Sequence, residues 1–240
     1  MYLGIILTLV AGLFFLIGII ILKNIKNKAS LSVFTIAMAF VVLLGLILEH
    51  LLPEVISYKN WYLLIPIVIG FLSFTIIDKL IPHHHHEHSD EKCDVTDHNR
   101  HLEHIGLITI VALALHNIIE GITLYNVSSN DIKSGLLLMI SISLHNIPFG
   151  FQIGNLLEVK KNKMLIAFLC LSSSIGALIM LAFGELNVLF ESILLSLTFG
   201  MLLYIMLFEF LQEVIKGMRK KETIIGLIIG LIIIFITHII

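Results

Sequence analysis

The sequence predicts an all-α integral membrane protein with eight transmembrane helices. Of its 240 residues, 58% are apolar and only 13% are charged, and the mean hydropathy is +1.03. Soluble proteins carry about 25% charged residues, so a water-soluble globule of this length has no place for so much apolar surface. This composition excludes a cytosolic enzyme, a secreted disulfide scaffold and a disordered chain. The net charge of −2 excludes nucleic acid as the main partner and leaves the lipid bilayer.

Eight apolar runs are long enough to cross a membrane. A helix needs roughly 20 apolar residues to span a hydrocarbon core about 30 Å thick. The runs do not alternate as the strands of a β-barrel would. The first run has no basic residue before it and no small-residue cleavage site, so it is expected to be a retained span. The chain is therefore expected to form one transmembrane domain over 1–240, with spans at 3–22, 31–52, 61–81, 104–126, 134–156, 163–183, 188–210 and 222–240.

Basic residues are concentrated on one side of these spans. Of the 15 lysines and arginines, only Lys59 and Lys133 fall in connections on the other side. The positive-inside rule then places both termini outside the cytoplasm of a plasma or inner membrane. Trp61 and Tyr62 suit the outer interface, where amphipathic rings gather.

One connection is much longer than the others and is rich in histidine. Residues 82–100 are expected to form a cytoplasmic loop whose composition favours disorder until something binds it. Flexible imidazole and thiol ligands bind borderline divalent metals quickly and without much selectivity. This segment therefore predicts a metal buffer or sensor rather than the transport site, with the ligands His83, His84, His85, His86, His88 and Cys93.

Two similar polar motifs interrupt the fourth and fifth spans. The fourth contains His116, Asn117 and Glu120, whose spacing places them on one stripe of a helix, and the fifth contains His145 and Asn146. Ionisable groups in a bilayer cost several kcal/mol, so each is a functional hypothesis by default. One such histidine is more often a packing residue, but two copies of His-Asn-Ile at similar depth disfavour packing alone. Imidazoles with a carboxylate predict a site for zinc, iron, manganese or cobalt rather than for calcium or sodium.

These motifs, the eight spans with outward termini and the His-rich loop resemble the ZIP (Zrt/Irt-like) family of divalent metal transporters, of prokaryotic type. The resemblance implies a 3+2+3 arrangement in which helices 1–3 and 6–8 form an inverted pseudo-repeat around helices 4 and 5. A short echo between His50-Leu-Leu-Pro-Glu-Val and Glu209-Phe-Leu-Gln-Glu-Val agrees with such a repeat. The resemblance also implies that zinc, or iron, manganese or cadmium, is the substrate and moves into the cytosol.

The resemblance assigns the metal ligands residue by residue. It implies a first metal position at His116, Glu120 and His145, and it gives Asn117 and Asn146 to a second, adjacent metal. Two positions depart from the family pattern, because Phe149 and Ser173 stand where relatives carry ligands. A dication held only by amides and a hydroxyl is poorly neutralised in hydrocarbon. We therefore expect one metal in the membrane.

Further polar residues lie toward the two ends of the spans. The outer entrance is expected at Glu49, His50 and Glu54. The inner exit is expected at Glu209, Glu213, His101 and His104. An ordinary solvated helix end would contain the same residue types, so both interpretations remain open. Glu191 and His238 are expected only to meet water.

Other functions compete with transport. A membrane-embedded metallohydrolase would use the same cage, but the chain lacks His-Glu-x-x-His, and we expect no enzyme activity. A transport-impaired relative that senses metal, or an efflux protein, would also fit. Gly226 and Gly230, four residues apart and expected on an outer face, would allow a homodimer.

Overall fold

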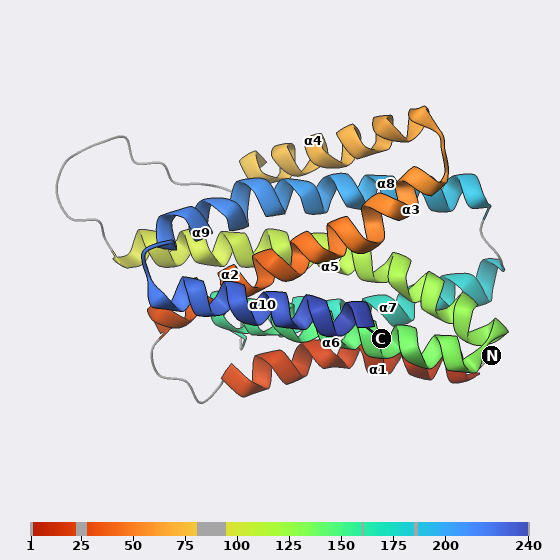
Figure 1. Ribbon diagram of the computed structural model, residues 1–240, viewed down its shortest axis with the longest axis horizontal. Coiled ribbons are helices and arrows are strands. Elements are labelled where there is room, and N and C mark those ends of the chain that lie inside the picture. The colour runs from red at the N-terminus through yellow and green to blue at the C-terminus, as the bar shows by residue number, and fades with distance from the viewer. Residues whose placement is uncertain (1, 23–27, 81–94, 160, 185–186, 240) are drawn as a thin grey trace.

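The computed structural model describes residues 2–22, 28–80, 95–159, 161–184 and 187–239, which are helical apart from short turns (Figure 1). Eight helical stretches within these ranges are long and apolar enough to cross a membrane. The predicted class, an all-α membrane protein with eight spans, is therefore confirmed. The elements are α1 (Tyr2–Leu22), α2 (Lys28–Leu46), η1 (Ile47–Leu51), α3 (Leu52–Ser57), η2 (Trp61–Leu63), α4 (Leu64–Leu80), α5 (Val95–Asn130), α6 (Ile132–Leu156), α7 (Lys163–Phe183), α8 (Val188–Tyr204), η3 (Ile205–Phe210), α9 (Leu211–Gly217) and α10 (Lys221–Ile239).

Several helices extend beyond the apolar runs that predict them. Helix α5 begins at Val95, so residues 95–100 are helical and not part of a loop as expected. The second span continues through α3 to Ser57, and the seventh continues through α9 to Gly217. The end of an apolar run marks where a chain leaves hydrocarbon, whereas a helix continues into water until a cap or turn ends it. Residues 82–94 of the expected loop, with all six of its proposed ligands, lie outside the described residues.

A single residue separates α5 from α6. The Asp131 carboxylate accepts hydrogen bonds from the N–H groups of Lys133 (3.2 Å) and Ser134 (3.1 Å), which caps the start of α6. The Ser134 hydroxyl also donates to this carboxylate, and this bond is the largest cause of the lowered pKa of Asp131, followed by the two N–H groups. The tight turn makes α5 and α6 antiparallel neighbours, so their central residues face the same region.

Helix α5 lies at the centre of the bundle. In its membrane-spanning window 72% of the residues are buried, against 22% for the span that contains α4 and 17% for α10. Helices α6 and α7 pack against α5, α1 packs along α6, α10 along α2 and α4 along α8. Figure 1 shows both termini at the same end of the bundle, opposite the ends of α4 and α5 that the long connection joins.

Glycines bring the backbones of the central helices into contact. A Cβ atom on Gly121 of α5 would overlap the carbonyl of Ser173 on α7, and one on Gly150 of α6 would overlap the carbonyl of Phe15 on α1. Only glycine allows such an approach, because any side chain would push the partner helix away. Each of the two motif-bearing helices is therefore held tightly against one partner, α5 against α7 and α6 against α1.

The two glycines of α10 face the inside of the bundle. Gly226 and Gly230 are buried, and a Cβ atom on Gly230 would lie 2.8 Å from the Cβ of Val41 on α2. The expectation that they lie on an outer face is wrong. The small residues are used for helix packing within the chain, so they offer no surface to a second copy.

Two wide π-helical turns interrupt the second and seventh spans. In the first, η1, the carbonyl of Glu49 cannot receive the usual helical hydrogen bond, because Pro53 four residues later has no N–H. In the second, η3, no proline follows, and Gln212 stands at the position that matches Pro53 in the sequence echo. The first residues of the two echo segments, His50 and Glu209, lie in these turns. Turns of this kind are frequent at functional sites.

Candidate metal centre

Three polar side chains converge where α5 and α6 face each other. His116 and Glu120 are one turn apart on α5, and the His116 Nε2 lies 3.1 Å from the Glu120 Oε1. From α6, the His145 Nε2 lies 3.2 Å from the same oxygen and 3.4 Å from the Glu120 Oε2. Both histidines are buried and Glu120 is half-buried. The structure thus brings together the three residues expected at the first metal position, which we call the central triad.

The spacing of the central triad is that of ligands around one small cation. One ligand atom from each residue lies within 4.8 Å of the others. Ligand atoms at about 2.0–2.2 Å from a tetrahedral zinc lie about 3.3–3.6 Å from each other. The His116 Nε2 lies close to Glu120, but its geometry is not that of a hydrogen bond to this or any other described residue. Its lone pair and the shared carboxylate oxygen are therefore arranged to suit a metal.

The expected second metal position has a different character. Asn117 and Asn146 are buried but are not among the residues that line the cavity at the triad. The Asn146 amide donates instead to the carbonyl of Ala11 on α1 (3.0 Å). Phe149 and Ser173 are each 1% exposed. Neither asparagine belongs to a described group of His, Cys, Asp and Glu ligands, and Phe149 and Ser173 supply no carboxylate.

A cavity of about 150 Å³ reaches the central triad from one end of the bundle. His50 and Glu54, two of the three residues expected at the outer entrance, line it together with the triad. Glu49 does not line this cavity. Its carboxylate lies 3.7 Å from the His238 Nδ1 at the end of α10. The structure therefore separates the expected entrance residues into two places.

Another acidic residue lies near Glu54, although it does not line the cavity. Glu191 in the first turn of α8 is half-buried, so the expectation that it only meets water is wrong. Burial raises the pKa of the Tyr58 hydroxyl, and the nearby carboxylates of Glu191 and then Glu54 raise it further. Negative charge from two spans thus gathers where a cation would enter.

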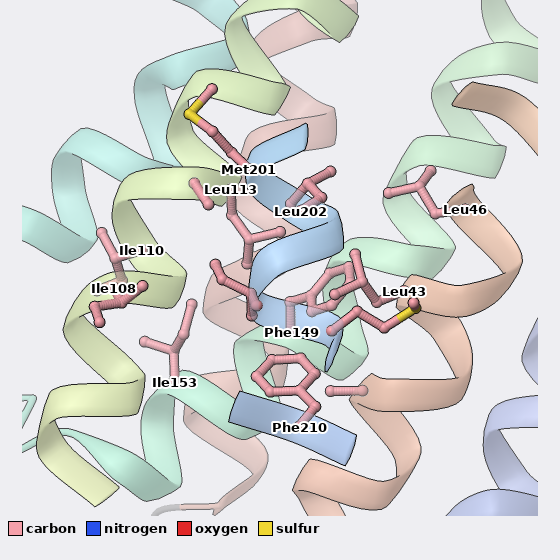
Figure 2. Close-up of a cluster of buried hydrophobic side chains, with 14 of the residues drawn as sticks. Leu43, Leu46, Ile108, Ile110, Leu113, Phe149, Ile153, Met201, Leu202 and Phe210 are labelled. Atoms are coloured by element: carbon pink, nitrogen blue, oxygen red, sulfur yellow. The ribbon is translucent and has the colours of Figure 1, made fainter. Parts of the chain in front are cut away.

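Apolar side chains close the other side of the central triad. Leu113 lies one turn before His116 on α5, and Phe149 lies one turn after His145 on α6. Figure 2 shows both in one cluster with Leu202 of α8 and Phe210 of η3. These four residues are at most 1% exposed. Among the described residues, the lining of this cavity therefore stops at the triad and does not include the apolar cluster.

A second polar cluster lies beyond the apolar side chains. It consists of Asp78 of α4, His104 of α5 and Glu209 of η3, whose ligand atoms lie within 4.8 Å of one another. The His104 Nε2 is 2.6 Å from the Asp78 Oδ1, and the Tyr204 hydroxyl donates to the Asp78 Oδ2 (2.9 Å). His104 is twelve residues before His116 on α5, which is about 18 Å along a helix. We call Asp78, His104 and Glu209 the inner cluster.

The inner cluster contains two of the four residues expected at the inner exit. Glu213 is not part of it and pairs with Lys216 (2.7 Å). His101 lies in α5, and its side chain is outside the described part of the chain. Asp78 and Tyr204 were not predicted from the sequence. Asp78 could have been recognised as a candidate, because it is an acidic residue next to Lys79 in the last turn of the third span.

Comparison with known proteins agrees with this geometry. No protein among the curated ones matches the chain. The model of the ZIP zinc transporter family matches residues 82–238, which is more than half of the chain. The matched range includes both His-Asn motifs and the five spans from α5 to α10. The chain therefore belongs to the ZIP zinc transporter family and is a multi-pass membrane protein of a family that transports divalent metals.

Proposed function

We propose that this protein moves divalent transition-metal ions, zinc above all, into the cytosol through one metal site formed by His116, Glu120 and His145. The observation that carries the proposal is the convergence of these three ligands, from two antiparallel helices, at the closed end of a cavity. Iron, manganese and cadmium remain alternative substrates, because their ligand preferences overlap with those of zinc. The family consists of transporters, which agrees with the absence of an enzyme motif in the sequence.

The charge of the site suits transport. Two neutral imidazoles and one carboxylate leave a bound dication with a net charge of about +1. Water in the cavity is available to complete the coordination shell. A transporter must bind its ion firmly enough to remove the hydration shell and weakly enough to release it. Because Phe149 and Ser173 supply no carboxylate, we propose one intramembrane metal, with Asn117 and Asn146 in a supporting role beside it.

The route has three parts. Metal enters by the cavity that His50 and Glu54 line, and it binds the central triad. It then passes the apolar cluster of Figure 2 when the helices rearrange, and the inner cluster receives it. The positive-inside bias supports an orientation in the plasma or inner membrane with both termini outside and the His-rich loop in the cytosol. The resemblance to the ZIP family supports inward movement.

The packing of the helices supports the predicted 3+2+3 pseudo-repeat. The pseudo-repeat exchanges the first three spans with the last three and the fourth span with the fifth. In this exchange α1 corresponds to α7 and α6 to α5, so the contact of α1 with α6 becomes that of α7 with α5. The contact of α2 with α10 likewise becomes that of α8 with α4. The glycine contacts at Gly121 and Gly150 are exchanged in the same way, and so are the turns η1 and η3. A homodimer remains part of the proposal but does not depend on Gly226 and Gly230.

Uptake by purified protein in liposomes tests the proposal. Vesicles that contain the protein are expected to accumulate external zinc, whereas protein-free vesicles are not. Zinc binding without accumulation would instead identify a metal sensor, and hydrolysis of lipid or peptide would identify a metallohydrolase. Either of these results contradicts the proposed function.

Deleting residues 83–94 is expected to leave the initial rate of uptake unchanged while altering how uptake responds to a metal load. The deletion removes the six ligands proposed for the loop and stops before Val95, where α5 begins. Radioactive zinc uptake at low and high external zinc measures both effects. If all uptake stops in this variant although the protein folds, the route does not run through α5 and α6 alone.

A further inference from the structure

A histidine and a carboxylate outside the two clusters described above lie close together near the C-terminus. Glu49 belongs to η1 and His238 to the last turn of α10, which packs along α2. The two residues are far apart in sequence, and their side chains meet at the surface, where they are 32% and 70% exposed. His238 was expected only to meet water, so its position beside a carboxylate is a result of the fold.

The distance between the two side chains suits a shared cation. The His238 Nδ1 and the Glu49 Oε2 are 3.7 Å apart. This distance is too long for a hydrogen bond. It is close to the separation of about 3.3–3.6 Å between two ligands of one tetrahedral zinc. Both side chains are partly exposed, so further ligands from outside the protein could complete the coordination and the ion could leave again.

A narrow crevice lies between Glu49 of this pair and His145 of the central triad, and His238 does not line it. Its volume is about 10 Å³, roughly the space of one water molecule. Glu49, His50 and His145 line it. His50 also lines the main cavity, so its imidazole stands between the two approaches to His145. Potential ligands thus follow one another from the surface pair through His50 to the triad.

The geometry points to an outer loading site for a divalent transition metal, formed by Glu49 and His238, from which His50 passes the ion to the central triad. The destination of the ion rests on the proposed function, but metal binding by the pair does not. The pair is expected to bind divalent transition-metal ions such as zinc and cadmium, because one imidazole and one carboxylate are suitable ligands for these ions. The rival explanation is a surface ion pair that fastens the end of α10 to η1.

Two substitutions of His238 separate these explanations. His238→Lys places a permanent positive charge beside Glu49 but offers no lone pair to a metal. His238→Cys offers no positive charge but supplies a thiolate, which cadmium prefers. A loading site predicts that His238→Lys raises the KM for cadmium uptake about tenfold at unchanged kcat, and that His238→Cys lowers it. If Glu49 and His238 form only an ion pair that fastens α10 to η1, the KM of His238→Cys is expected to be higher than that of His238→Lys. This result would overturn the inference. Ile236→Val, a small change at a neighbouring residue that does not line the crevice, is the control.

A binding measurement that needs no transport completes the test. In a variant with His238→Cys, His116→Ala and Cys93→Ser, external cadmium is expected to slow the reaction of the new thiol with a membrane-impermeant maleimide at least about tenfold. Adding Glu49→Gln is expected to remove this protection. Protection without any uptake by the wild-type protein would refute the proposed function and leave the loading site standing. Absence of protection would refute the loading site, whatever the uptake.

Discussion

Replacing Glu120 with glutamine is expected to reduce zinc uptake about 100-fold or more at low external zinc. Glu120 is the only carboxylate among the three ligands of the central triad, and both histidines lie within 3.2 Å of its Oε1. Loss of a mere hydrogen-bond partner of a metal ligand already costs about 10–100-fold in metal affinity. The variant also leaves a dication in the membrane with no negative charge beside it. Initial rates of uptake into liposomes measure the effect.

Thr123→Ala is the matched control for this substitution. Thr123 is three residues after Glu120 on the same helix and lines the same cavity, but its hydroxyl is engaged with the carbonyl of Ile119 (3.3 Å). Its removal is expected to leave uptake unchanged. If Glu120→Gln transports zinc as fast as the Thr123 variant does, the central triad is not the transport site.

Replacing Gly121 with alanine is expected to destabilise the protein strongly. Gly121 is the residue after Glu120, and a Cβ atom there would overlap the backbone carbonyl of Ser173 on α7. Neither backbone can move without separating α5 from α7. Overpacking of this kind costs about 1–3 kcal/mol, which corresponds to a fall of roughly 2–12 °C in Tm for a chain of this size. The thermal unfolding of the protein in detergent measures the shift.

Gly106→Ala on the same helix provides the comparison. A Cβ atom at Gly106 would lie 2.8 Å from the Cγ of Leu157, a side chain that can change its rotamer. The Tm of Gly106→Ala is therefore expected to fall by much less than the Tm of Gly121→Ala. Equal shifts in the two variants would mean that the backbone contact between α5 and α7 does not hold the site together.

The sequence was sufficient to predict the eight spans but not where the helices end. Apolar runs report contact with lipid, so they marked the membrane-embedded parts of α5 and of the seventh span and stopped at the water boundary. The wide turns η1 and η3 have no signature in hydropathy, and Pro53 explains only the first of them. The inward direction of Gly226 and Gly230 was also out of reach, because a stripe of small residues does not reveal whether its partner belongs to the same chain.

The central triad was predictable because its ligands are local. His116 and Glu120 are one turn apart, and a repeated motif marks His145 as their partner on the next span. The other sites combine residues from distant helices. Asp78 meets His104 only because α4 packs along α8, which in turn packs against α5, and Glu49 meets His238 only because α10 packs along α2. No spacing in the sequence encodes these contacts.

Anomalous diffraction at the zinc edge, from crystals of the protein grown with zinc, tests the central claim most directly. We predict one peak between α5 and α6, about 2.0–2.2 Å from the ligand atoms of His116, Glu120 and His145. The peak is expected to disappear in the His116→Ala variant. A zinc-loaded protein with no peak at these three residues, or with a second peak held by Asn117 and Asn146, would contradict the single-metal site.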